Sequence, residues 1–103
     1  MIERVWTGEL QPHLIEEFLE EVVRQDFAAM ATADGFLGAR VLRPFEDDRV
    51  TVLLITRWRD AEALRAYAGD GWRGDPVIYD WERPFLQARP KVTHFLEAGA
   101  IET

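Results

Sequence analysis

Few side chains in this sequence could take part in catalysis, and their types limit the reactions that the protein could catalyse. The chain has two His, two Tyr and four Trp, but no Ser, Cys or Asn. Without Ser and Cys it has no hydroxyl or thiol nucleophile of the hydrolase kind, no disulfide and no thiolate zinc site. Two His are also too few for a multi-His zinc or iron site, so we expect no metal.

His94 is our first candidate for a catalytic base. Among the side chains present, only an imidazole titrates near neutral pH in its ordinary state, so His94 could accept a proton from a phenol. It falls in a predicted strand, on the same face as Val92 and Leu96. The alternative is therefore a hydrogen-bonded core histidine. His13 begins the first predicted helix, where we expect an exposed or capping residue.

Aromatic side chains supply the second set of candidates. Trp58 ends a predicted strand, where its ring could stack on a flat aromatic substrate and its indole N–H could hold an oxygen atom. The alternative is a core residue that fills the junction between sheet and helix. Four more rings and one arginine are candidates for the substrate pocket: Tyr67, Trp72, Tyr79, Trp81 and Arg4.

Three of these rings lie in segment 69–90, which is rich in Gly and Pro. A passive linker would not carry so many aromatics, so we expect a loop that closes a cavity between helix and sheet. Tyr79 is then a catalytic orienting group. The alternative is that the rings anchor the loop to the core or to a partner subunit. Arg4 could hold an anionic or quinone oxygen, or pair with a carboxylate.

The overall composition predicts one globular domain, residues 1–103. A chain of 103 residues with 48% hydrophobic residues can bury one core but not two. The formal charge of −7 argues against nucleic acid as a partner. No apolar run has the length of a membrane helix and the first residues lack a signal-peptide pattern, so we expect a cytoplasmic protein that does not associate with membranes.

Hydrophobic periodicity predicts six main elements in the order βαββαβ. Strands are expected at 2–10, 36–45, 49–58 and 91–97, helices at 13–34 and 60–69, and a short helix near 82–89. In the second strand, Leu37, Ala39 and Val41 are expected to share one face. This order predicts an α+β, ferredoxin-like fold, in which a four-stranded antiparallel sheet carries both helices on one face.

The third predicted strand is apolar on both faces. Val52 and Leu54 point one way, whereas Leu53 and Ile55 point the other. A broad apolar sheet face left in water promotes aggregation. We therefore expect a second copy of the chain to cover the open face of the sheet, which gives a two-fold symmetric homodimer.

Four stretches of the sequence together resemble a known family. They lie ahead of the first helix, in the second strand, at the junction of the third strand with its helix, and in the last strand: 2–8, 35–43, 56–64 and 92–95. On these stretches the chain resembles the antibiotic biosynthesis monooxygenase family of the dimeric α/β-barrel superfamily, over nearly its whole length.

The resemblance implies several activities. Members of the family include cofactor-free oxygenases that act on polycyclic phenols and anthrones, haem-degrading enzymes, and small proteins without established activity. The active members use an Asn near the first strand, a Trp at the end of the third, and a His or Tyr near the helical segment that follows. Trp58 matches the Trp, whereas this chain contains no Asn.

Three functions follow as hypotheses. The leading one is a cofactor-independent monooxygenase-like homodimer that binds a small aromatic or quinol-type molecule, with His94 as base and with Trp58 and Tyr79 as orienting groups. It needs no cofactor, because the deprotonated substrate itself reacts with O2. The second is a protein that binds or degrades haem through one His. The third is a non-catalytic dimer that binds a small ligand or has a structural role.

Overall fold

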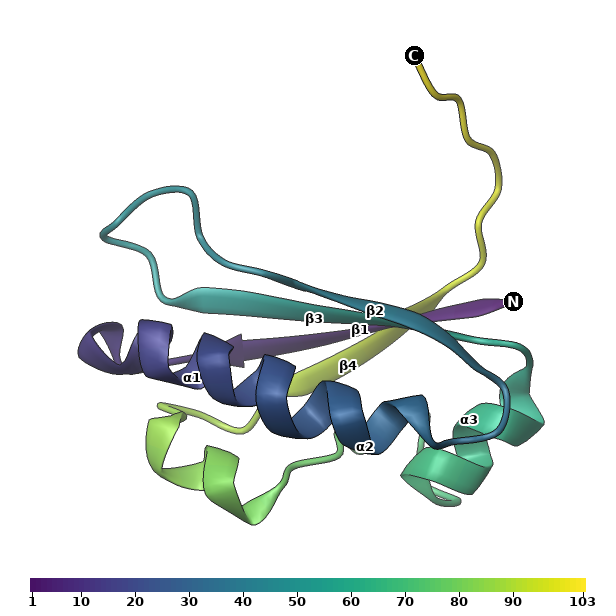
Figure 1. Cartoon of the computed structure of the whole chain (residues 1–103), viewed down its shortest axis with the longest axis horizontal. Helices are drawn as coiled ribbons and strands as arrows, with labels where there is room; N and C mark the ends of the chain where they lie inside the picture. Colours follow the sequence, from purple (N-terminus) through teal and green to yellow (C-terminus); the bar gives the residue numbers. More distant parts are fainter.

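The four strands form one antiparallel sheet. The computed structural model describes residues 1–103 and orders the strands β2-β3-β1-β4. Their bounds are β1 (Ile2–Glu9), β2 (Phe36–Leu42), β3 (Thr51–Trp58) and β4 (Lys91–Phe95). All the helices lie on one face of this sheet (Figure 1). The predicted ferredoxin-like α+β fold is therefore confirmed.

One long helical segment covers most of the sheet. It consists of a short 3₁₀ turn, α1, a π-helical turn and α2: Pro12–Leu14, Ile15–Glu21, Val22–Asp26 and Phe27–Ala31. The sequence predicted this helix, but not its π-helical turn, a feature that often occurs at functional sites. After β3 comes α3 (Ala61–Ala68), whose first turn is capped by Asp60 Oδ1, the acceptor for the N–H of Ala63 at 2.8 Å. No helix is both long and apolar enough to span a membrane.

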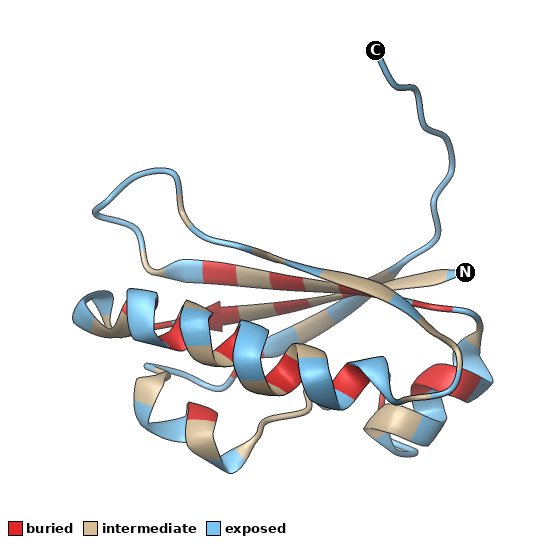
Figure 2. Ribbon diagram, viewed as in Figure 1, coloured by how far each residue is buried: buried red, intermediate tan, exposed pale blue.

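The hydrophobic core lies between the helices and the inner face of the sheet. In Figure 2 the buried stripes of β1 and β3 face the buried side of the long helical segment. The alternation in β3 places Val52, Leu54 and Trp58 in this core, as predicted. The helix contributes residues at intervals of four, which repeat along one face: Phe18, Val22, Asp26 and Met30. One member of this buried row is an acid.

Strand β2 departs from the prediction at a bulge. Phe36 pairs with Trp58 and Gly38 pairs with Arg57, so Leu37 is an extra residue without a partner. Leu37 is consequently exposed, whereas Ala39 and Val41 pack against the core. The prediction that all three share one face was wrong for Leu37. The strand also ends at Leu42 rather than 45, ahead of Pro44, which has no N–H to donate to a ladder.

The segment between α3 and β4 packs on the helix side of the sheet. It contains one 3₁₀ helix (Asp80–Phe85), slightly earlier than the short helix predicted near 82–89. Strand β4 ends at Phe95, two residues before the predicted end, and residues 96–103 extend away from the sheet (Figure 1).

The outer face of the sheet carries no helix and is partly apolar. Val5, Leu53 and Ile55 lie there, and each is only partly buried. Val5 pairs with Ile55 across β1 and β3, and Leu53 pairs with Leu42 across β3 and β2. The apolar character of both faces of β3 is therefore confirmed, whereas the cover over the outer face stays a prediction.

Gly35 should be required for the turn between α2 and β2. Its φ of 80° is in the left-handed region, and a Cβ there would overlap the Cβ of Ala63. We expect Gly35→Ala to lower the free energy of unfolding by more than about 1 kcal/mol, measured by urea denaturation with circular dichroism. Gly74→Ala is the matched control, because its Cβ would meet nothing within 4 Å. Equal denaturation midpoints for the two variants would contradict this account.

Candidate functional site

An interior cavity lies between the inner face of the sheet and the helical layer. Its volume is about 20 Å³, which is room for about one water molecule. It is lined by residues from β1, β3, the long helical segment, α3, the loop that follows and the 3₁₀ helix Asp80–Phe85: Arg4, Trp6, Asp26, Met30, Leu54, Thr56, Tyr67, Val77, Tyr79 and Glu82. We call this space the helix–sheet cavity. Apart from Trp6, six of the ten lining residues carry a side-chain group that can donate or accept a hydrogen bond: Arg4, Asp26, Thr56, Tyr67, Tyr79 and Glu82.

Two carboxyl groups, Asp26 and Glu82, are buried side by side in the wall of this cavity. Each residue is only 2% exposed. Asp26 Oδ1 accepts a hydrogen bond from Nε1 of Trp81 at 3.1 Å, and Glu82 Oε1 accepts one from the backbone N–H of Tyr79 at 2.7 Å. Asp26 Oδ2 is buried and has no hydrogen-bond donor. The wall therefore contains one carboxylate oxygen without a partner.

Burial keeps this pair of carboxyl groups protonated at higher pH than usual. Desolvation is the main cause, and it raises the pKa of Asp26 to about 6 and that of Glu82 to about 8. The charge of Asp26 also raises the pKa of Glu82, and a hydrogen bond between the two groups lowers the pKa of Asp26. The pair therefore retains protons to higher pH than ordinary carboxyl groups do.

Two tyrosines, Tyr67 and Tyr79, also line the cavity. Tyr67 comes from α3 and Tyr79 from the loop before the 3₁₀ helix, and their hydroxyl oxygens are 2.5 Å apart. Desolvation raises the pKa of both, so both hydroxyls keep their protons at neutral pH. One hydroxyl donates to the other, which leaves the hydrogen of the accepting hydroxyl free to donate elsewhere. The predicted pocket residues Tyr67 and Tyr79 thus both line the cavity.

Arg4 lines the cavity and is hydrogen-bonded to β4 and to the loop after α3. Its guanidinium donates to the carbonyl oxygens of Trp72 at 2.7 Å and Asp75 at 2.9 Å. It also lies 2.9 Å from Nε2 of His94. A guanidinium can only donate, so Nε2 of His94 is the acceptor and the ring is neutral. Arg4 was predicted to hold a substrate oxygen; in this structure it holds two backbone carbonyls and an imidazole.

His94 lies on the far side of Arg4 and does not line the cavity. Burial, followed by the charges of Arg4 and Arg73, lowers its pKa. Trp72 packs edge-on against its ring, with 4.9 Å between the ring centres. The lone pair of His94 Nε2 is therefore already engaged in a hydrogen bond. Its predicted role as a base is not tested by this geometry and stays a prediction.

Trp58 and Trp81 also lie behind the cavity wall. Trp58 is fully buried, donates from Nε1 to Oγ1 of Thr56 at 2.9 Å, and stacks on Tyr67 with 4.8 Å between ring centres. This placement supports the core alternative for Trp58. Trp81 packs against Phe18 at 5.3 Å and donates to Asp26. Both residues contact residues that line the cavity but do not line it themselves. Their predicted direct contact with substrate stays a prediction.

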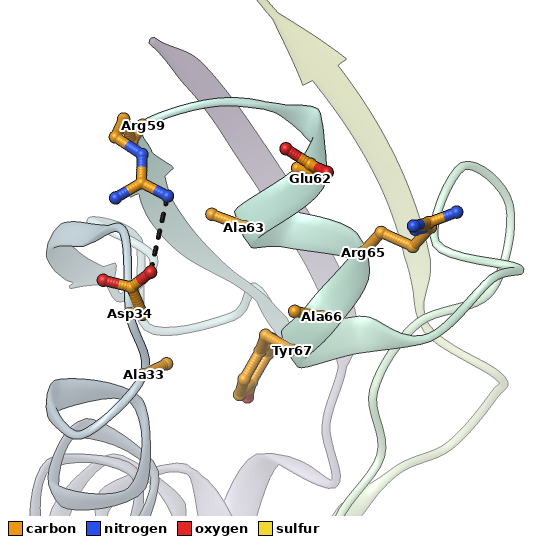
Figure 3. Close-up of a pocket in the computed structure, with 8 residues that line it drawn as sticks. All are labelled: Ala33, Asp34, Arg59, Glu62, Ala63, Arg65, Ala66 and Tyr67. Atoms are coloured by element: carbon orange, nitrogen blue, oxygen red, sulfur yellow. Dashed lines mark hydrogen bonds and ion pairs between the residues drawn. The ribbon is translucent and has the colours of Figure 1, made fainter.

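A larger groove opens on the surface between the end of α2 and α3 (Figure 3). Its volume is about 460 Å³, and it is lined by Ala33, Asp34, Arg59, Glu62, Ala63, Arg65, Ala66 and Tyr67. An ion pair between Arg59 and Asp34, 3.5 Å long, spans it. Tyr67 lines both this groove and the helix–sheet cavity. Tyr67 is therefore the residue that this groove and the helix–sheet cavity have in common.

The sequence analysis missed Asp26 and Glu82. Asp26 occupies a position in the buried helical row where Phe18, Val22 and Met30 are apolar, and an acid at that spacing is a signal that could have found it. Glu82 had no such signal, because it lies in a segment without periodicity. No group of three or more His, Cys, Asp or Glu side chains is placed to hold a metal ion.

The carboxyl pair should make folding stability depend on pH. The folded state keeps the protons of Asp26 and Glu82 above the ordinary pKa values of 3.8 and 4.5, so unfolding releases protons in that range. The contribution of the pair to the free energy of unfolding is therefore full below about pH 4, falls as the pH rises, and levels off above about pH 8.

Glu82→Gln tests this dependence, because glutamine keeps an oxygen that can accept from the N–H of Tyr79. We expect the variant to lose less stability than wild type between pH 5 and pH 8, measured by urea denaturation at each pH. The opposite contribution of His94, whose pKa is lowered, cancels in this comparison. Glu20→Gln, at an exposed position, should follow wild type. Parallel curves for all three proteins would show that the pair does not titrate in this way.

The chain is similar to one protein family and to a group of solved structures. The family model described as antibiotic biosynthesis monooxygenase matches residues 1–71. No curated protein sequence matches significantly. A monooxygenase of Streptomyces coelicolor, solved in complex with nanaomycin D, is 19% identical with a TM-score of 0.75, and the match covers 99% of this chain and 91% of that one.

A second solved structure has a different ligand. The haem degrader MhuD of Mycobacterium tuberculosis, with two haems bound in its active site, is 17% identical with a TM-score of 0.73. The match covers 99% of this chain and 100% of that one. At these identities the two structures show a shared fold. The family model spans well over half of the chain, so this protein belongs to the antibiotic biosynthesis monooxygenase family.

Proposed function

We propose that this protein is a cofactor-independent monooxygenase that binds a small aromatic or quinol-type substrate in the helix–sheet cavity. The observation that carries the proposal is the convergence of buried polar side chains there. Arg4, Asp26, Tyr67, Tyr79 and Glu82 line a space that simple core packing would fill with apolar groups. Burying such groups is costly, and perturbed acids that converge on a cavity are typical of functional sites.

We propose that a substrate enters the cavity from the neighbouring groove, past the side chain of Tyr67. The cavity of about 20 Å³ is too small for an aromatic ring, whereas the adjoining groove of about 460 Å³ is within the usual size of small-molecule sites. Tyr67 separates the two, and its hydroxyl is tied to Tyr79. Rotation of these two rings would join the groove to the cavity and present both hydroxyls to the substrate.

The proposed reaction needs a base, a hydrogen-bond donor and a dry pocket. Loss of a proton gives an electron-rich anion, which transfers an electron to O2 and then combines with it to form a peroxide. For an anthrone, the methylene carbon loses two hydrogens and gains one oxygen atom, and the second oxygen atom leaves as water. The substrate is oxidised by four electrons and O2 is reduced by four. The tyrosine hydroxyl that is free to donate would stabilise the developing oxyanion.

Haem fits the residues present less well. A haem iron is commonly held by the free ring nitrogen of a histidine. Nε2 of His94 already accepts a hydrogen bond from Arg4, and Trp72 packs edge-on against the ring. His13 is exposed, in the short turn before α1 and away from the lining of the cavity. The donor set therefore favours an organic substrate, and no step of the proposal passes through haem.

The proposal also includes a homodimer formed through the outer face of the sheet. Val5, Leu53 and Ile55 form a partly exposed apolar area there, next to the exposed Leu42 and Phe95. Burying this area against a second copy would remove it from water, and a two-fold interface brings the same patch from both subunits together.

Oxygen consumption tests the proposed activity. Wild type should consume O2 faster than buffer with at least one member of a panel of anthrones and hydroquinones. Tyr79→Phe removes a donor to the oxyanion and should lower kcat/KM by about 10²-fold. Phe45→Ala, at a side chain that is 95% exposed, is the control and should match wild type. If wild type shows only the buffer rate across the panel, a non-catalytic binding protein becomes the better description.

Light scattering tests the proposed dimer. Leu53→Glu places a charge in the centre of the outer face and should shift the mass in solution from dimer to monomer, because a buried unpaired charge is strongly unfavourable at an interface. Val23→Glu makes the same change of charge on the exposed side of the helical layer, where Val23 is 53% exposed, and should leave the dimer intact. A monomeric wild type would contradict this part of the proposal.

A further inference from the structure

We propose that His94 is a pH-sensitive switch for the segment that joins α3 to the 3₁₀ helix Asp80–Phe85, residues 69–79. Neutral His94 accepts a hydrogen bond from Arg4 and thereby keeps this segment on the sheet. Protonated His94 cannot accept that bond, and the segment loosens. The inference concerns how the segment is held, so it does not depend on the proposed monooxygenase activity. It gives His94 a role other than the catalytic base expected from the sequence.

The first observation is that one nitrogen of Arg4 binds both His94 and the segment. Nη1 of Arg4 donates to the carbonyl oxygen of Trp72 at 2.7 Å and lies 2.9 Å from Nε2 of His94. This nitrogen carries two hydrogens, one for each partner. Nη2 donates to the carbonyl oxygen of Asp75 at 2.9 Å. A change at Nε2 of His94 therefore acts directly on the group that holds the segment.

The second observation is that Arg4 is buried without an acidic partner. The residue is 4% exposed, and none of the ion pairs in the structure includes it. Its side-chain hydrogen bonds go to two backbone carbonyls and one imidazole, all neutral acceptors. A buried cation depends strongly on such partners. Of the three acceptors, only the imidazole can take up a proton at mildly acidic pH.

The third observation concerns the charges around His94. Arg4 acts on it from β1 and Arg73 acts on it from the segment, and both are positive. The two acids of the segment, Asp70 and Asp75, are each paired with another arginine, at 3.9 Å and 3.5 Å. Burial and the two cations lower the pKa of His94, so the ring is neutral at neutral pH. Protonation would add a third positive charge beside two that no acid compensates.

His94 is accessible to protons and has room to move. It lines a surface hollow of about 130 Å³ with four apolar residues: Ile2, Trp72, Phe95 and Leu96. A protonated imidazole carries a hydrogen on both nitrogens, so Nε2 and the Arg4 guanidinium would each point a donor at the other. The ring can turn into the hollow and away from Arg4. Because Trp72 packs edge-on against this ring, its packing then changes as well.

The segment connects this switch to the helix–sheet cavity. Val77 and Tyr79 line the cavity, and both follow Trp72 and Asp75 along the segment. At its far end the segment is held by the hydrogen bond between the hydroxyls of Tyr79 and Tyr67. Loosening at Trp72 and Asp75 removes the nearer attachment of the part that carries these lining residues. The wall of the cavity is therefore held more firmly at neutral pH than at acid pH.

Hydrogen exchange of the unliganded protein tests the switch. The backbone N–H groups of Trp72, Gly74 and Asp75 are hydrogen-bonded to carbonyls within the segment. We expect wild type to lose at least about tenfold of their protection as the pH falls from about 7.5 to about 4.5, after correction for the intrinsic exchange rate. The amides of β1 and β3 should keep their protection, which shows that the opening is local.

Two variants of His94 separate its neutral and protonated roles. Glutamine keeps an acceptor near the position of Nε2 but does not titrate, so His94→Gln should keep the protection of the segment over the whole pH range. His94→Leu has no acceptor and should show low protection at both ends of the range. His13→Gln replaces the exposed histidine before α1 and should follow wild type. Asp26 and Glu82 titrate in all four proteins, so their contribution cancels.

Two results would overturn the proposal. One is the same pH dependence of protection in wild type and His94→Gln. The other is a long-range ¹H–¹⁵N NMR spectrum in which neutral His94 carries its hydrogen on Nε2 rather than on Nδ1, because Nε2 could then not accept from Arg4. If the variants fail to fold, this spectrum and the exchange profile of wild type decide. Neither measurement needs a ligand or turnover, so the switch and the proposed oxygenase activity can fail independently.

Discussion

The hydrogen bonds of the buried Arg4 guanidinium hold the site together. They connect three parts of the chain that are far apart in the sequence: β1, the loop that carries the carbonyls of Trp72 and Asp75, and His94 on β4. A buried cation needs such partners, because an unpaired one would be too costly to desolvate. The irregular segment after α3 is fastened to the sheet in this way. The positions of Tyr79 and Glu82, which follow in that segment, depend on it.

The interior of this small protein contains polar groups that its stability does not require. Three of the twelve buried hydrophobic core residues line the helix–sheet cavity, and two acids and two tyrosines line it with them. A fully apolar interior of the same volume would fold with less desolvation of polar groups. The molecule retains them in paired form, Asp26 with Glu82 and Tyr67 with Tyr79, and each pair needs fewer outside partners than two separate groups would.

The fold could be predicted because its pattern is regular. The alternation of β3, the paired apolar residues of the first helix and the Asp60 cap each specify their element locally. The bulge at Leu37 could not be foreseen, because it depends on how β2 pairs with β3. In the site, Tyr67 and Tyr79 were identified by type, whereas Glu82 reaches the cavity only through long-range packing of an aperiodic segment. The place of Asp26 in the buried helical row could be recognised from the sequence, but the sequence analysis did not identify it as a site residue.

The hydrogen bond from Trp81 to Asp26 has a spectroscopic consequence. An indole senses charge near its ring, and Nε1 of Trp81 lies 3.1 Å from a carboxyl oxygen whose charge depends on pH and on what occupies the cavity. The other three Trp side chains are not bonded to any acid: the N–H of Trp58 is held by the neutral hydroxyl of Thr56. The fluorescence emission of Trp81 is thus an intrinsic reporter of the protonation state of Asp26.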